Sequence, residues 1–273
     1  MQILLTNDDG ITAKPLWALY RRLLPRHAVT VVAPDRERSA IGHAITLNVP
    51  LRYQSVAVDE NGKGFAVNGT PADCVKLALH QLMTQKPDLV IAGINPGANV
   101  GVNINYSGTV AAAKEAVLSG LPAMAVSINS HRPRFLAQSA RVTADLIEQL
   151  WRQGLPEKAA VNINVPDQKP GNIAGVQWCR QNNRVVIDGF QKQFDPRDKT
   201  YFWYTFPEQL EHISDEEAVT VGDDTAMLRK GYITITPIQC RLTDERALAH
   251  CRQRPLNDFW GKLKKDYQKQ EVL

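Results

Sequence analysis

Two adjacent aspartates, Asp8 and Asp9, are the residues of this sequence best suited to chemistry. They stand in the run Asn7-Asp8-Asp9-Gly10, directly after a short apolar segment. Two neighbouring carboxylates repel each other unless a positive charge lies between them, and a divalent cation would supply that charge. The same four residues are also typical of a tight turn, because Asn and Asp cap turns and Gly accepts a positive φ.

Two further oxygen-bearing side chains, Ser39 and Asn95, each follow another apolar, strand-like segment. Together with the two aspartates they offer carboxylate, hydroxyl and amide oxygens, and the set contains neither His nor Cys. Hard oxygen ligands of this kind favour magnesium, manganese or calcium over zinc. These side chains therefore predict a site for one such divalent cation, held by Asp8, Asp9, Ser39 and Asn95.

The tripeptide Ser107-Gly108-Thr109 stands at the start of an alanine-rich helical segment. Free backbone amides and the positive end of the helix dipole bind anions at such a position, so these residues are candidates for holding a substrate phosphate. A plain helix cap by Ser107 or Thr109 is the structural alternative. The glycine-rich run from Gly97 to Gly101 is not a Walker loop, because no Gly-Lys-Ser/Thr follows it. It is not a dinucleotide fingerprint either, because the pattern Gly-x-Gly-x-x-Gly is absent.

The elements that must position these residues alternate between strand and helix along the first half of the chain. Strands are predicted at Ile3–Thr6, Val29–Ala33, Phe65–Val67, Asp88–Ala92, Ala123–Val126 and Val161–Val165. Helices are predicted at Leu16–Leu24, Ala72–Met83, Thr109–Leu118 and Arg134–Trp151. This alternation predicts an α/β fold with a doubly wound, mostly parallel, Rossmann-like sheet, whose ligands bind beyond the carboxyl ends of the strands.

The second half of the sequence has a different pattern, with strands that no regular helices separate. These strands are predicted at Val185–Ile187, Thr200–Phe206, Ala218–Val221 and Tyr232–Thr236. We place a soft boundary near residue 180. It divides a catalytic core, residues 1–180, from a C-terminal extension, residues 181–273, which forms a β-rich arm region with oligomerisation elements.

Composition excludes several classes of protein. Lys and Arg exceed Asp and Glu by 32 to 28 over 273 residues. That surplus of four equals the surplus between Arg252 and Lys269 alone, which is most simply a solvated helix or a frayed end. The remaining chain is balanced, so no face for polymeric nucleic acid is expected. Scattered cysteines, no signal peptide and no long apolar run predict a cytoplasmic protein without a disulfide framework, a structural zinc site or a membrane span.

Four other features have structural explanations that we favour. His43 is expected to pack or to lie on the surface, and Cys74 to be buried behind a capped helix start at Thr70. Asp223 and Asp224 are expected to begin a helix, where acidic residues are favourable.

The motifs taken together resemble those of the SurE family, the stationary-phase survival proteins that act as nucleotidases. The resemblance extends over residues 1 to about 237 and is carried by Asn7-Asp8-Asp9-Gly10, Ala33 to Ser39 with Gly42 to Thr46, Gly69 to Val75, Gly93 to Val110, Asn162 to Pro166 and Gly231 to Pro237. The sequence departs from the usual family pattern at Pro96, Ala98 and Ala116, and it matches poorly from residue 180 to 230. None of the departures falls on a proposed metal ligand.

The resemblance implies a metal-dependent phosphomonoesterase that hydrolyses nucleoside monophosphates, a 5′-nucleotidase with 3′-nucleotides and short polyphosphate as candidate further substrates. It implies metal ligands at Asp8, Asp9, Ser39 and Asn95 for one Mg²⁺ or Mn²⁺ ion per subunit, with Asp8 and Asp9 also catalytic. It also implies a homodimer or homotetramer joined through exchanged C-terminal elements. Two other classes remain open on the residues alone: a metal-dependent nucleotide-sugar transferase, and a non-enzymatic nucleotide-binding or interaction protein.

Overall fold

A mixed sheet of nine strands forms the centre of the computed structural model, which describes residues 1–57, 62–183, 189–205, 222–254 and 256–270. In spatial order the strands are β3 (Tyr53–Ala57), β4 (Lys63–Val67), β2 (Ala28–Pro34), β1 (Gln2–Thr6), β5 (Leu89–Pro96), β6 (Ala123–Asn129), β7 (Ala159–Pro166), β11 (Tyr232–Gln239) and β8 (Gly175–Trp178). All neighbours from β4 to β7 pair in parallel, whereas β3 and β11 run antiparallel to β4 and β7. The predicted α/β class with a mostly parallel sheet is confirmed.

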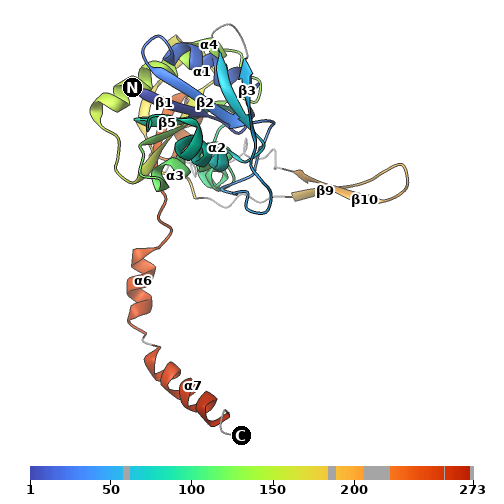
Figure 1. Ribbon diagram of the computed structural model, residues 1–273, viewed down its shortest axis with the longest axis vertical. Helices are drawn as coiled ribbons and strands as arrows, with labels where there is room; N and C mark the ends of the chain where they lie inside the picture. Colours follow the sequence, from blue (N-terminus) through green and yellow to red (C-terminus); the bar gives the residue numbers. More distant parts are fainter. Residues whose placement is uncertain (58–61, 184–188, 206–221, 255, 271–273) are drawn as a thin grey trace. The chain divides into compact units, whose positions relative to one another are not determined.

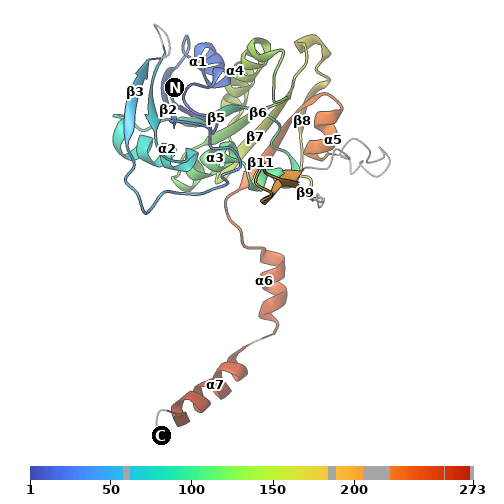
Figure 2. The same cartoon turned by 90° about the vertical axis from the view of Figure 1, so that its right-hand side faces the viewer.

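Helices cover both faces of this sheet. The helices are α1 (Lys14–Leu23), α2 (Pro71–Leu77), α3 (Gly108–Leu118), α4 (Leu136–Gln153) and α5 (Asp224–Arg229). Helices α1 and α4 lie on one face and α2 and α3 on the other, as Figures 1 and 2 show. Such doubly wound covering explains why the central strands β1, β5, β6 and β7 are buried along almost their whole length.

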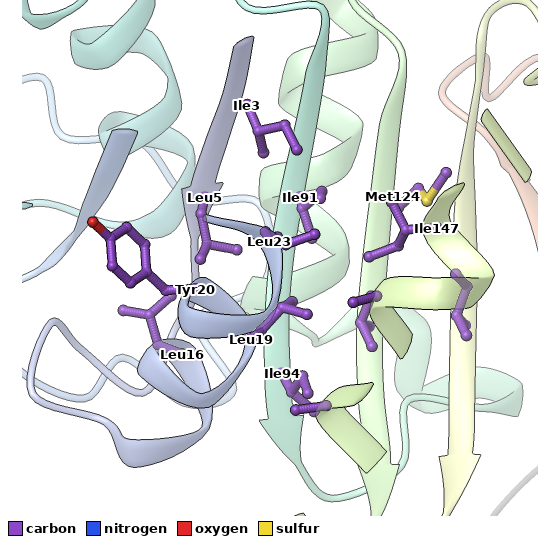
Figure 3. Packing of buried hydrophobic residues seen from close by; sticks show 14 of the residues in the cluster. Ile3, Leu5, Leu16, Leu19, Tyr20, Leu23, Ile91, Ile94, Met124 and Ile147 are labelled. Atoms are coloured by element: carbon purple, nitrogen blue, oxygen red, sulfur yellow. The ribbon is translucent and has the colours of Figure 1, made fainter. Parts of the chain in front are cut away.

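The two faces of the sheet bury separate hydrophobic clusters. On one face, Leu5, Ile91 and Met124 from three adjacent strands meet Leu19 of α1 and Ile147 of α4 (Figure 3). The opposite face packs against α2 and the alanine-rich α3, whose small side chains allow close approach to the sheet. Side chains that alternate between the faces of each strand thus build a core on both sides.

The order of the strands places a switch point between β1 and β5. From β1 the chain proceeds outward on one side to β2 and β4, and on the other side β5 leads to β6 and β7. Loops that leave the carboxyl ends of β1, β2 and β5 therefore lie at one edge of the sheet, at the switch point where doubly wound sheets usually bind their ligands. Asp8 and Ser39 belong to the connections after β1 and β2, and Asn95 is the second-last residue of β5.

Several predicted boundaries in the first half were wrong. Strand β5 continues to Pro96, so that Asn95 lies within the strand and not after it. The helix predicted from residue 72 to 83 divides into α2 and a π-helical turn, Ala78–Leu82. Strands β3 and β8 were not predicted, because they lie at the sheet edges with largely exposed side chains and show no apolar run.

Beyond residue 180 the structure contains more helix than the sequence pattern indicates. Strand β11 joins the main sheet, while β9 (Gly189–Phe194) and β10 (Thr200–Thr205) form a separate antiparallel hairpin (Figure 1). The strands predicted at residues 185–187 and 218–221 lie outside the described residues, as does Phe206. Two helices, α6 (Glu245–Arg252) and α7 (Asn257–Gln270), follow Cys240.

The contacts within the chain divide it after Cys240, whereas the sequence places its soft boundary near residue 180. One compact unit is Met1–Cys240 and the other Arg241–Leu273. The first unit extends so far because β11 hydrogen-bonds to β7. In the part of the chain that the structure describes, no helix combines the length and the apolarity that crossing a membrane requires.

Replacing a leucine at the centre of the sheet is expected to be costly. Leu5 is fully buried, so Leu5→Ala should lower the free energy of unfolding by about 2–5 kcal/mol through lost burial and a residual cavity. Urea denaturation of the purified protein measures this. The matched control is Leu118→Ala on α3, where the side chain is 61% exposed and the loss should stay within about 0.5 kcal/mol. Equal losses in the two variants would contradict the packing described here.

Candidate functional site

Asp8 is placed by the end of β1 and held by the start of α3. Its side chain is buried, and the hydroxyl of Thr109 donates a hydrogen bond to Asp8 Oδ1 at 2.5 Å. The backbone of Thr109 adds a second hydrogen bond that lowers the pKa of Asp8, although burial is the larger influence and raises that pKa overall. The positive end of α3 thus faces a carboxylate of the chain itself.

Gly108 is required for this close approach. A Cβ atom at Gly108 would lie 2.8 Å from Asp8 Cβ and 3.0 Å from Asp8 Oδ2. Ser107 caps the helix, since its hydroxyl oxygen accepts from the amide of Val110 at 3.1 Å. The capping alternative is therefore correct for Ser107, whereas Thr109 contacts Asp8. The first amides of a helix have no carbonyl partner inside it, so the Gly108 amide is suited to an anion.

Asp9 has a strongly raised pKa and a buried carboxylate oxygen without a hydrogen-bond partner among the described residues. Burial, together with the charges of Asp8 and Glu37, raises the pKa of Asp9 to about 7. Its Oδ2 atom is buried and accepts no hydrogen bond from any residue that the structure describes. A buried carboxylate oxygen without a partner, beside further carboxylates, is an arrangement that a hard cation would stabilise.

The loop after β2 is fastened to Asp8 through its backbone. The amide of Arg38 donates to the carbonyl oxygen of Asp8 at 2.7 Å, which brings Ser39 to the same edge of the sheet. The exposed Ser39 hydroxyl donates to Glu37 Oε1 at 2.7 Å. Sequence reasoning missed Glu37, although it stands in the loop that carries Ser39 and its charge reaches both Asp8 and Asp9.

Asn95 lies at the same edge, because β5 and β1 are adjacent parallel strands. Its side-chain amide donates to the carbonyl oxygen of Gly97 at 2.7 Å, so that the amide oxygen is the atom available to a cation. Within the described residues, neither Ser39 nor Asn95 hydrogen-bonds to Asp8 or Asp9. A hydrogen bond links Asp8 directly to Thr109. Asp9, Ser39 and Asn95 lie at the same edge of the sheet because strands β1, β2 and β5 end there.

The chemistry of these donors matches the predicted ion. No group of three or more His, Cys, Asp or Glu side chains that could hold a metal occurs among the described residues. A cation at Asp8 and Asp9 would therefore also need neutral oxygens, and Ser39 and Asn95 offer a hydroxyl and an amide oxygen. Such a set fits a hard ion that retains waters better than it fits zinc.

His43 does not reach the aspartates. Its Nε2 atom contacts Glu115 Oε2 at 2.9 Å, and Lys76 Nζ contacts the other oxygen of Glu115 at 2.6 Å. Glu115 is buried in α3, so the contact fixes the loop that follows Ser39 against this helix. The structural explanation for His43 is confirmed.

The remaining structural expectations are also confirmed. Cys74 is fully buried in α2, whose start has a capping box formed by Thr70 and Asp73. Asp223 caps α5, because its side chain accepts from the amide of Ala226 at 2.7 Å. Burial raises the pKa of Cys74 well above its ordinary value, as expected for an inert core thiol.

Known proteins resemble this chain along most of its length. The family described as Survival protein SurE matches residues 3–188. The chain belongs to the SurE family. A relative named 5′-nucleotidase SurE from Desulfatibacillum aliphaticivorans is 49% identical over 247 residues, which are 89% of this chain and 94% of that relative.

Two further SurE proteins support this membership. One from Nitratidesulfovibrio vulgaris (strain DP4), also named 5′-nucleotidase SurE, is 46% identical over 91% of this chain and 97% of its own length. The crystal structure of the SurE protein from Aquifex aeolicus superimposes with a TM-score of 0.78 at 33% identity, covering 92% of this chain and 98% of that chain. The SurE resemblance and the fold predicted from the sequence are both confirmed.

The raised pKa of Asp9 predicts how the stability of the metal-free protein depends on pH. The pKa of Asp9 is about 7 when folded and near 3.8 when unfolded, so the folded state binds the proton more tightly. Stability should therefore fall as pH rises from about 4 to about 7. Asp9→Asn removes this contribution and should gain stability relative to the wild type between pH 5 and pH 8. Thermal unfolding in the presence of a chelator measures the difference.

The matched control for this pH series is Asp145→Asn, on the exposed surface of α4. Its stability relative to the wild type should not change with pH in the same way. A constant offset between Asp9→Asn and the wild type from pH 5 to pH 8 would contradict the assignment.

Gly108→Ala should destabilise the fold, because the added Cβ overlaps the Asp8 side chain. Such overpacking costs about 1–3 kcal/mol and should appear as a lower melting temperature. Gly171→Ala is the control, since a Cβ there meets no atom within 4 Å. An unchanged melting temperature for Gly108→Ala would show that Asp8 does not lie against the start of α3.

Proposed function

We propose that this protein is a divalent-metal-dependent 5′-nucleotidase, which hydrolyses nucleoside monophosphates to nucleoside and phosphate. The observation that carries the proposal is the desolvated pair Asp8 and Asp9 beside the start of α3. This site occurs in a chain 49% identical to a relative named 5′-nucleotidase SurE. The relatives give no support to the nucleotide-sugar transferase or to the non-enzymatic binding protein.

The residues that would hold the metal are Asp8, Asp9, Ser39 and Asn95. The unpartnered Oδ2 atom of Asp9 supports this assignment, and so does the oxygen-only donor set. When bound, one Mg²⁺ or Mn²⁺ ion per subunit would act as a Lewis acid at a phosphoryl oxygen and offset the charge that develops there. A phosphate beside two carboxylates would otherwise be repelled.

Ser107, Gly108 and Thr109 would bind the phosphate oxygens at the positive end of α3. The amide of Gly108 and the hydroxyl of Ser107 are the donors at the start of this rigid helix, which favours one orientation of the phosphoryl group. Thr109 would act by holding Asp8 beside that phosphoryl group, because its hydroxyl already donates to Asp8. Asp8 and Asp9 would hold the attacking water and accept its proton at a carboxylate oxygen. Positioning and electrostatic stabilisation supply most of the catalysis when phosphoryl transfer passes through a loose transition state.

The proposal extends to further substrates and to assembly. We infer that 3′-nucleotides and short polyphosphate are additional substrates, and that the protein acts in the cytoplasm without polymeric nucleic acid or membrane as a partner. Residues 1–180 form the catalytic core, and residues 181–273 join copies into a homodimer or homotetramer. Exposed aromatic side chains on β9 and β10 support an assembly role, namely Phe190, Phe194, Phe202, Trp203 and Tyr204.

The test is phosphate release from a panel of nucleoside monophosphates with Mg²⁺, Mn²⁺ and Ca²⁺, for the wild type and for Asp9→Ala. Loss of Asp9 should lower kcat by two or more orders of magnitude, equivalent to about 3 kcal/mol of transition-state stabilisation. Asp145→Ala, at an exposed aspartate of α4, should keep the wild-type rate.

Two results would overturn the proposal. Wild-type turnover by Asp9→Ala at saturating metal would remove the aspartate from the reaction. The absence of phosphate release by the wild type with every ion and nucleotide would favour a non-enzymatic nucleotide-binding protein.

A further inference from the structure

We infer that Asn162 and Asn164 of β7 are positioning residues for the candidate site. They capture Asn99 and thereby fix the glycine-rich loop that connects Asn95 with the start of α3. This inference rests on the proposed function, because it concerns the metal ligand at one end of the loop and the phosphate-binding residues at the other. The run Asn162-Ile163-Asn164 is otherwise unexplained, since neither asparagine belongs to the site itself.

Asn99 makes four hydrogen bonds to buried side chains of two strands. Its amide donates to Asn164 Oδ1 at 2.8 Å, and its carbonyl oxygen accepts from Asn162 Nδ2 at 2.8 Å and from Asn164 Nδ2 at 3.0 Å. Its own side-chain amide donates to Ser127 Oγ of β6 at 2.8 Å. Asn162, Asn164 and Ser127 are fully buried, so water does not compete for these bonds.

The side chains of the two asparagines bind the backbone of Asn99, as the backbone of a neighbouring strand would do in a sheet. Asn164 both accepts from the Asn99 amide and donates to the Asn99 carbonyl, as a backbone partner in a sheet does. Asparagine has both an acceptor and a donor at the end of its side chain, whereas leucine has neither and aspartate lacks the donor. The residue type at position 164 therefore matches the backbone that it holds.

The loop has two other fastenings, one on each side of Asn99. The Gly97 amide donates to the carbonyl oxygen of Ile128 at 2.9 Å. The Gly101 amide donates to Asp224 Oδ2 at 3.0 Å, and Gln181 Nε2 donates to the Gly101 carbonyl oxygen at 2.8 Å. Asn99 is the central attachment, four residues after Asn95 and eight before Ser107.

Burying the two side-chain amides costs free energy of hydration, so we infer that they do more than stabilise the core. Every residue of β7 is buried, and amides in such a strand lose hydration that apolar side chains would not lose. Thr234 of β11 pairs in register with Asn164 and is equally buried, yet its hydroxyl makes no hydrogen bond. Both asparagines differ from Thr234 because each donates a hydrogen bond to the Asn99 carbonyl oxygen, although Asn162 Oδ1 has no partner among the described residues.

Partners that orient a metal ligand usually affect metal affinity or activity by 10- to 100-fold when they are removed. The decisive variant is Asn164→Leu, which keeps the branched shape and the number of side-chain heavy atoms and removes both bonds to the Asn99 backbone. Its matched control is Thr234→Val, which removes a buried hydroxyl beside it without touching Asn99. Both are made in the full-length protein and compared with the wild type.

Three measurements are made on each protein. Calorimetric titration with Mn²⁺ in the absence of nucleotide gives the affinity for the ion. Hydrogen exchange followed by mass spectrometry reports on loop peptides between Asn95 and Tyr106. Steady-state kinetics at saturating Mn²⁺ separate kcat from KM.

We expect Asn164→Leu to weaken Mn²⁺ binding by tenfold or more, to speed exchange in the loop and to lower kcat more than it raises KM. Thr234→Val should resemble the wild type in all three measurements. Wild-type Mn²⁺ affinity and loop protection in Asn164→Leu, with only a lower melting temperature, would overturn the inference and leave Asn164 a purely structural residue.

A second variant keeps the test decisive if Asn164→Leu does not fold. Asn162→Ser removes only one of the donors to the Asn99 carbonyl oxygen and should weaken Mn²⁺ binding in the same direction by a smaller factor. Unchanged affinity in Asn162→Ser would then overturn the inference. A wild type that binds no Mn²⁺ would refute the proposed function and this inference together, whereas binding by the wild type and equal binding by the variants would refute the inference alone.

Discussion

Asp8 and Asp9 are adjacent carboxylates in a site from which water is largely excluded. Their mutual repulsion and the loss of hydration are the constraint on which the surrounding structure depends. Burial raises the pKa of both groups, the charge of Asp8 raises the pKa of Asp9 further, and the charge of Glu37 acts on both in the same direction. The start of α3 offsets part of that cost at Asp8 through Thr109. Among the described residues no donor reaches Asp9 Oδ2, so a positive charge beside this atom would be favourable.

The arrangement of the sheet determines which other groups can reach that place. Because β1 lies between β2 and β5 at the switch point, the connections after these three strands share one edge of the sheet. Gly108 allows α3 to approach Asp8 more closely than any residue with a Cβ could. The start of α3, where free backbone amides favour an anion, therefore lies against Asp8, an arrangement that would suit a metal-bound substrate carrying a phosphate.

Backbone hydrogen bonds and buried side chains then hold the connections still. The amide of Arg38 ties the loop after β2 to Asp8, and the asparagines of β7 hold Asn99. Apolar side chains in β7 would make a simpler core, but they could not hold an irregular loop by its backbone. The buried asparagines of β7 therefore belong to the core and at the same time support the candidate site.

The sequence by itself determined the fold class and singled out the two aspartates and the start of α3 as candidates for the site. It could do so because apolar periodicity and adjacent charges are local properties of a chain. It could not place Asn95 inside β5, reveal that Glu37 affects the aspartates, or show that Ser107 caps while Thr109 bonds Asp8. Those facts depend on contacts between segments up to a hundred residues apart. Only the tertiary structure decided them, since hydrogen bonding and desolvation act through space and leave no signal in the spacing of residues along the chain.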